Sequence, residues 1–86
     1  MIAKALGHPA RVAIVRLLLT RTACSAGELV AELPLSQSTV SQHLKELSNA
    51  GLVRGESQGA RNCYRLDAAR WARAQELIGG LLGELG

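Results

Sequence analysis

The sequence predicts a mainly α-helical domain with one small β-hairpin, in the order four helices, two strands and a last helix. Apolar residues recur every three or four positions up to Gly51, as on one face of a helix, and then change to alternation, as in strands. Helix start and stop signals divide the helical part into short pieces. With 86 residues, the chain is long enough for one small domain, and we take residues 1–86 as that domain.

Composition indicates an aliphatic core and a moderately basic surface. Hydrophobic residues make up 48% of the chain, with one Trp, one Tyr and no Phe, so part of the apolar surface is expected in a subunit interface. A net charge of +3 is compatible with a nucleic-acid partner but does not require one. The sequence lacks a long apolar run and a signal peptide, and two Cys are too few for a disulfide framework. We therefore expect a cytoplasmic protein with reduced thiols and no membrane partner.

The N-terminal part predicts two helices. Residues 2–6 form the end of a first helix that Gly7 terminates, and Pro9 suits the first turn of the next, with His8 as a polar residue at its cap. Residues 11–21 form a central core helix, because apolar side chains cover much of its circumference. Those side chains are Val12, Ile14, Val15, Leu17, Leu18 and Leu19.

A short helix and a longer one follow, joined by a tight turn. Ser25 and Glu28 form a capping box at the start of the short helix, and Pro34 closes it. Ser36 is the N-cap of the longer helix, which Gly51 ends. Its apolar stripe consists of Val40, Leu44 and Leu47. The arrangement is a helix-turn-helix.

The outward face of residues 36–50 carries side chains that hydrogen-bond base edges and phosphates. This predicts a DNA-recognition helix, the alternative being an ordinary solvated face. His43, beside the apolar stripe, is expected to pack and seat the helix rather than to bind a ligand. The expected DNA contacts are Gln37, Ser38, Thr39, Ser41, Gln42 and Lys45.

The hairpin is predicted from residues 52–57 and 61–66, with the turn at residues 58–60. A hairpin directly after a recognition helix is the wing of a winged helix-turn-helix. Arg54, Arg61 and Arg65 are expected to contact phosphates or the minor groove. An ordinary solvated hairpin is the alternative, and the helix before it favours DNA.

Asp67 is the N-cap candidate of the last helix, which carries a heptad-like apolar stripe. This stripe packs either on the domain's own core or against a second copy, and we favour the second copy. The terminal helices 1–6 and 67–85 then form the dimer interface. The expected interface residues are Leu6, Trp71, Ala74, Ile78, Leu81 and Leu85.

Five motifs together resemble the ArsR/SmtB family of winged-helix repressors. They lie at residues 5–12, 27–29, 35–44, 50–53 and 64–66. The resemblance covers about residues 4–67. Members are typically homodimers that bind an operator near their own promoter, and many dissociate from it when a metal, a metalloid or another inducer binds. The resemblance therefore implies a homodimeric repressor of this kind.

The resemblance also places inducer sensing at thiols in some members. Arsenic- and cadmium-sensing members carry a Cys-x-Cys pair where this chain has Cys24, and others carry Cys-Tyr-Cys where it has Cys63. Zinc-sensing members use Asp, His and Glu along the last helix, and residues 67–86 contain no His. A soft metalloid such as trivalent arsenic takes about three thiolates, so the two Cys would have to come together.

Three interpretations of the thiols stay open: inert structural residues, a metalloid or soft-metal site, and a redox pair. Cys24, expected to be exposed at a helix N-terminus, is the more reactive candidate. No cofactor is required, and no nucleophile–base–acid set indicates an enzyme. The expected function is a DNA-binding transcriptional repressor, and the rival is a winged-helix protein-interaction module that does not bind DNA.

Overall fold

The computed structural model describes residues 2–21, 23–59 and 61–85. Their order of elements agrees with the predicted fold class and adds one strand to it. The elements are α1 (Ile2–Ala5), α2 (Pro9–Thr20), β1 (Cys24–Ser25), α3 (Ala26–Glu32), α4 (Gln37–Asn49), β2 (Val53–Gln58), β3 (Arg61–Leu66) and α5 (Ala68–Leu85).

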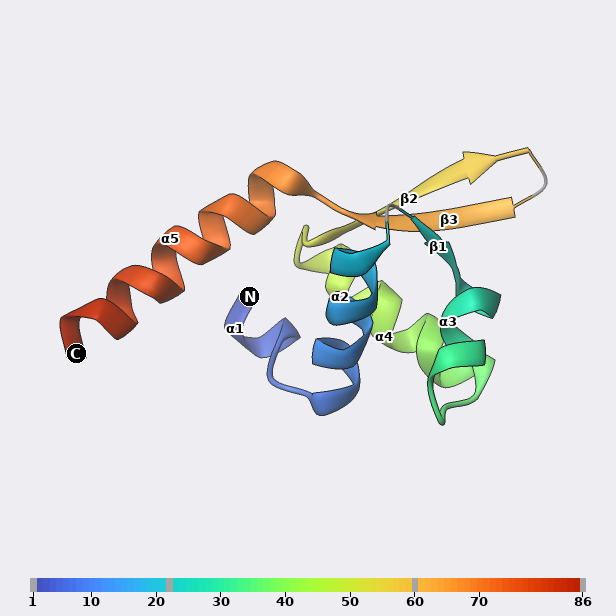
Figure 1. The fold of residues 1–86 in the computed structure, drawn as a ribbon, viewed down its shortest axis with the longest axis horizontal. Coiled ribbons are helices and arrows are strands. Elements are labelled where there is room, and N and C mark those ends of the chain that lie inside the picture. Colours follow the sequence, from blue (N-terminus) through green and yellow to red (C-terminus); the bar gives the residue numbers. More distant parts are fainter. Residues whose placement is uncertain (1, 22, 60, 86) are drawn as a thin grey trace.

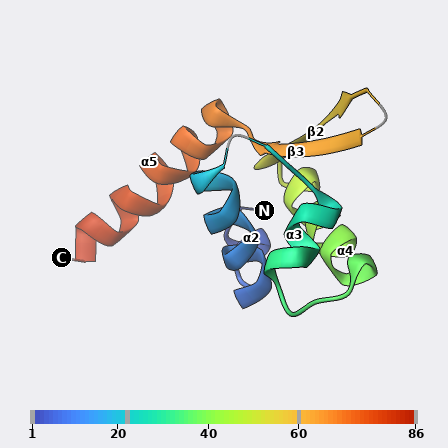
Figure 2. The ribbon, with the colours of Figure 1, turned by 45° about the vertical axis from the view of Figure 1, so that its right-hand side comes forward.

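The helices α2, α3 and α4 form the body of the molecule, with α1 beside them (Figure 1). The β2–β3 hairpin projects from this body on one side, and α5 projects on the other. The turned view of Figure 2 shows the same separation. The extents of 45 × 25 × 21 Å reflect these two extensions. A projecting wing and a projecting terminal helix are therefore both available to partners.

The sheet has three antiparallel strands among the described residues, in the order β1-β3-β2. The sequence predicts the hairpin but treats residues 20–24 as a connection, whereas Cys24 and Ser25 pair with Tyr64 and Cys63 of β3. A strand of two residues has no alternating pattern of its own. Its partner lies far along the chain, so local sequence could not reveal it.

The core brings together α2, α3, α4 and the inner face of the sheet. Its fully buried large side chains are Ile14, Cys24, Leu29, Val40, Leu44, Leu47, Leu52 and Val53. The predicted circumferential burial of α2 is wrong at two positions, since Val12 is 37% and Leu19 is 55% exposed. The neighbouring elements cover α2 on the side of Ile14, Val15 and Leu18, and Val12 and Leu19 lie away from it.

Three predicted helix starts are confirmed by their capping hydrogen bonds. The His8 Nδ1 atom accepts from the Ala10 N–H at 3.1 Å. Ser25 Oγ accepts from the Glu28 N–H at 3.2 Å, and the Glu28 carboxylate accepts from the Ser25 N–H at 3.0 Å, which completes the capping box. Asp67 Oδ1 accepts from the Arg70 N–H at 3.0 Å.

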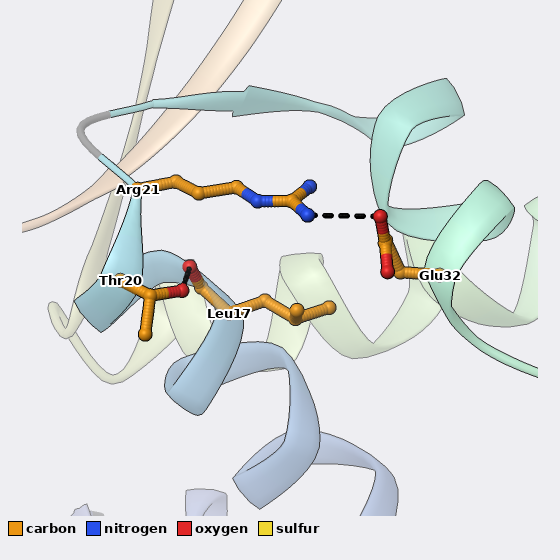
Figure 3. A network of polar contacts seen from close by, with 4 residues as sticks. All are labelled: Leu17, Thr20, Arg21 and Glu32. Carbon is orange, nitrogen blue, oxygen red and sulfur yellow. Dashed lines mark hydrogen bonds and ion pairs between the residues drawn. The ribbon is translucent and has the colours of Figure 1, made fainter.

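An ion pair ties the end of α2 to the end of α3 (Figure 3). Arg21 Nη2 donates to Glu32 Oε1 at 2.8 Å, and one residue earlier the Thr20 hydroxyl donates to the Leu17 carbonyl at 2.9 Å. Glu32 first, and the Cys24 thiol second, raise the pKa of Arg21. Because the pair is exposed, it contributes little to the stability of the fold.

We expect Leu44→Ala to lower the free energy of unfolding by about 2–5 kcal/mol, because it leaves a cavity beneath α4. Leu19→Ala should change it by no more than about 0.5 kcal/mol, since Leu19 is exposed. Urea denaturation at one fixed protein concentration measures both values. Equal losses for the two variants would contradict the orientation of α2.

Candidate nucleic-acid interface

The helix α4 begins as the sequence predicts. Ser36 Oγ accepts from the Thr39 N–H at 3.2 Å, and the Ser36 hydroxyl donates to Thr39 Oγ1 at 2.9 Å. Leu35 packs against the core cluster that contains the fully buried Val40. The first turn of α4 is therefore fixed both by polar groups and by apolar contacts.

The helix α4 ends in a Schellman motif at Gly51. The Leu52 N–H donates to the Leu47 carbonyl at 3.0 Å, and the Gly51 N–H donates to the Ser48 carbonyl at 2.9 Å. Gly51 has φ +80°, which confirms the predicted left-handed stop. A Cβ at this position would also lie 3.2 Å from Arg70 Nη1 of α5. Glycine is required here by backbone conformation and favoured by close packing.

The side of α4 away from the core is polar and open. Gln37, Ser38, Ser41, Gln42 and Lys45 are exposed, and Thr39 is half-buried. Ser48 and Asn49 are also exposed and extend this face, although the sequence analysis did not select them. The spacing of Ser41, Lys45 and Ser48 at i, i+4 and i+7 is the signal that identifies Ser48. The predicted contact residues thus share one accessible surface.

His43 lies on the opposite side of α4 and is 8% exposed. Its Nδ1 accepts from Arg11 Nε of α2 at 3.2 Å, and its ring lies against the His8 ring with the centroids 4.5 Å apart. Burial first, then the nearby His8 and Arg11, lower the pKa of His43 below its ordinary value. The structure confirms His43 as a packed histidine. It also shows Arg11 as the partner, which the sequence analysis did not find.

In the wing, Arg54 and Arg65 lie directly opposite each other on β2 and β3. The register places them near the base of the hairpin, toward α5. Arg65 Nη1 is 3.7 Å from Glu56 Oε1, and Arg54 Nε is 4.0 Å from Asp67 Oδ2. Both cations therefore have a carboxylate nearby.

At the wing tip, Gly59 has φ +64°, which agrees with the predicted glycine turn. Gln58 and Arg61 pair across the strands at this end of the hairpin. The predicted contact of the Arg61 side chain falls outside the described part of the structure, as does the predicted turn residue Ala60. Of the predicted wing arginines, the backbone places Arg61 alone at the tip.

The two thiols are buried, at 0% exposure for Cys24 and 5% for Cys63. The expectation that Cys24 is exposed is wrong, because β1 places it in the core before the α3 cap. Cys24 pairs with Tyr64, so these two share a face of the sheet, and Cys63 points to the other face. Although β1 and β3 are neighbours, the two thiols of one chain lie on opposite faces.

Within the described residues, the structure contains no cluster of three or more His, Cys, Asp or Glu that could hold a metal ion. The register of β1 and β3 does not bring Cys24 and Cys63 of one chain together, because they lie on opposite faces of the sheet. A soft ion bound by about three thiolates would need thiols from a second chain.

An apolar groove of about 310 Å³ runs between α1 and α5. Four of the predicted interface residues line it, together with Gln75, Gly79 and Leu82. The four are Leu6, Trp71, Ala74 and Ile78. Leu81 is exposed and is not among the lining residues, and the Leu85 side chain lies outside the described part. The predicted stripe is therefore divided between the groove and the open surface of α5.

Residues 6–56 match a family model described as a helix-turn-helix domain. Over 63 residues the chain is 48% identical to the HTH-type transcriptional repressor SmtB of Mycobacterium tuberculosis. The chain belongs to the ArsR/SmtB family. The match covers 73% of this chain and 46% of that repressor, so the chain spans about half the length of this curated relative.

Solved structures agree with this family and with the winged helix-turn-helix fold. A possible transcriptional regulator for arsenical resistance has a TM-score of 0.81 at 33% identity, covering 91% of this chain and 80% of that one. A homodimeric winged helix-turn-helix DNA-binding domain of Mycobacterium bovis has a TM-score of 0.78 at 26% identity, covering 96% of this chain and 76% of that one.

The family and the curated relatives are transcriptional regulators, not enzymes, which agrees with the prediction. Separately, none of the helices in the described ranges is long and apolar enough to cross a membrane.

We expect neither thiol to react quickly with an aromatic disulfide reagent in the native protein, because both are buried. The rate should be at least about tenfold below that of Ser57→Cys, which places a third thiol on the exposed part of β2. In guanidinium, both native thiols should react. Absorbance of the released aromatic thiol measures the rates, and a fast native thiol in the unmodified chain would contradict the burial.

Proposed function

We propose that this chain is the DNA-binding domain of a homodimeric transcriptional repressor that reads its operator with α4. The observation that carries the proposal is the open polar face of α4, fixed by a cap at Ser36, a stop at Gly51 and a buried stripe beneath. A surface residue on a rigid element can hold the geometry that base readout needs. The ArsR/SmtB family and its repressor members support the same function.

In this proposal, each protomer inserts residues 36–50 into a major groove. Gln42 suits a bidentate contact with adenine, and Lys45 suits guanine or a phosphate. Ser38 and Thr39, near the helix N-terminus, suit a phosphate, because N–H groups and the helix dipole favour an anion there. Two recognition helices related by a twofold axis would read half-sites about 34 Å apart.

The wing supplies contacts that do not depend on sequence. Arg61 is the candidate for a phosphate or the minor groove at the tip. Arg54 and Arg65 are proposed as phosphate contacts nearer the base, where DNA would compete with Asp67 and Glu56 for them. Exposed ion pairs of this kind are weak, so a phosphate can replace the carboxylate.

The groove between α1 and α5 is proposed as the dimer interface. Its lining is mostly apolar and includes the exposed Leu82, and Leu77 and Leu81 of α5 are exposed beside it. An apolar surface of this kind favours burial against another protein. The homodimeric Mycobacterium bovis domain, which shares the fold, supports a second copy as that partner.

Release by trivalent arsenic or another thiol-reactive signal stays a prediction. The burial of Cys24 and Cys63 on opposite faces of the sheet supports the first of the three interpretations, in which both are structural residues. A metalloid or soft-metal site and a redox pair remain the alternatives for the release step. The reducing cytoplasm stays the expected compartment.

We expect Gln42→Ala to weaken binding to the preferred duplex by about 1–3 kcal/mol and to relax specificity, because a base contact is lost. Lys45→Ala and Arg61→Ala should weaken binding to all sequences and make the salt dependence less steep. Fluorescence anisotropy on duplexes selected from a random pool, with scrambled duplexes beside them, measures these effects.

Arg16→Ala is the matched control, because it removes an exposed charge from α2 outside the proposed interface. Equal losses for Gln42→Ala on selected and scrambled duplexes would contradict the role of α4. Weak binding to every duplex by the unmodified chain would favour the protein-interaction module.

We expect Ile78→Glu to raise the dimer dissociation constant by roughly 30-fold or more, since a buried charge at an interface costs about 2 kcal/mol or more. Leu19→Glu is the control, an equal change at an exposed apolar residue outside the groove. Analytical ultracentrifugation measures both. A dimer unaffected by Ile78→Glu would place the interface elsewhere.

A further inference from the structure

We propose that Arg11 and His43 are positioning residues for DNA readout, forming a junction that holds α4 against α1 and α2 only while His43 is neutral. This inference rests on the proposed function, since it takes α4 as the element that reads DNA. It adds a regulation of that same site: acid lowers operator affinity through His43.

Arg11 is the centre of the junction. Its Nε donates to His43 Nδ1 at 3.2 Å, while its Nη1 donates to the Lys4 carbonyl at 3.3 Å and the Ala5 carbonyl at 3.5 Å. One side chain of α2 therefore holds the last turn of α1 and the middle of α4. Because Leu6, which directly follows α1, lines the groove, this junction also connects the groove to α4.

His43 can accept from Arg11 only in its neutral form. Protonation places a hydrogen on Nδ1, so the acceptor becomes a donor that faces a guanidinium, which has no acceptor. The charged and titratable groups that act on His43 are His8 and Arg11 from the α2 side and Glu46 from α4 itself. From α1 the junction meets backbone carbonyls, which bind Arg11. Glu46 is the single carboxylate among them.

The direction in which stability changes with pH follows from the direction of the His43 pKa shift. The pKa of His43 is lowered from 6.5, by burial first and by His8 and Arg11 next. Below about pH 6.5 the unfolded chain therefore binds more protons than the folded one. The contribution of neutral His43 to stability is present above this pH and is lost as pH falls through the folded pKa.

The junction lies directly behind the reading face. His43 is adjacent to Gln42 in sequence, and Lys45 is two residues further on the exposed side. Loss of the Arg11 contact therefore acts on the turn of α4 that carries the proposed base contact. Acid ordinarily strengthens DNA binding, because it adds positive charge. A loss of affinity in acid is opposite to this ordinary effect, so it distinguishes the proposed junction from general electrostatics.

The test is fluorescence anisotropy of the full chain between pH 7.5 and pH 5 on a duplex selected from a random pool at pH 7.5. We expect the unmodified chain to lose about 3- to 10-fold in affinity over this range, the size of one lost hydrogen bond, because protonated His43 no longer accepts from Arg11. His43→Asn keeps an acceptor near the Nδ1 position but does not titrate. Relative to its own affinity at pH 7.5, this variant should show no loss in acid.

His8→Asn is the matched control, because it removes the neighbouring imidazole and keeps an N-cap acceptor for the Ala10 N–H. It should retain the acid loss. Amide hydrogen exchange of α4 without DNA is the second readout, and protection should fall in acid for the unmodified chain but not for His43→Asn. Because hydrogen exchange is measured without DNA, it tests the junction even if a variant binds DNA poorly for another reason.

An affinity that stays constant or rises in acid overturns the junction, as does an equal acid loss in His43→Asn. Either result leaves the proposed function intact if the selected duplex still binds more tightly than a scrambled one at pH 7.5. Absence of any sequence preference at pH 7.5 overturns the proposed function, and with it the role of the junction in readout.

Discussion

The buried stripe of α4 is the constraint on which the rest of the structure depends. Val40, Leu44 and Leu47 are fully or almost fully enclosed by the other helices and the sheet. Since this stripe fixes the rotation of α4 about its axis, it also decides that Gln42 and Lys45 face solvent. The polar face is accessible because the apolar face of α4 packs against the core. Stability and proposed DNA readout thus depend on the same helix.

Local chemistry made much of this fold predictable. Ser36, Gly51 and Asp67 act on backbone groups within a few residues, so their roles can be read from sequence alone. The strand β1 and the exposure of Val12 and Leu19 could not be read in this way. The strand and these exposures depend on which distant elements pack nearby. The apolar residues of α2 alone do not indicate which side of the helix will be covered.

In the candidate site too, local sequence predicts some features and tertiary packing decides the others. The exposed face of α4 follows from helical spacing, which predicts that Ser41 and Lys45 lie together. The contact between Arg11 and His43 joins residues 32 positions apart, and it needed the packing of α2 on α4 to become visible. Strand register, not composition, decides that Cys24 and Cys63 face opposite sides of the sheet. The sequence motifs give the positions of the thiols but not the face of the sheet to which each one points.

The pairing of β1 with β3 has a consequence for the order of folding. A two-residue strand whose partner lies across α3, α4 and β2 closes a long loop, and such non-local contacts form late because loop closure carries an entropy cost. The helices inside the loop and the hairpin depend on nearer neighbours. We therefore expect a newly synthesised chain to hold its recognition helix before β1 fixes the direction in which the wing points.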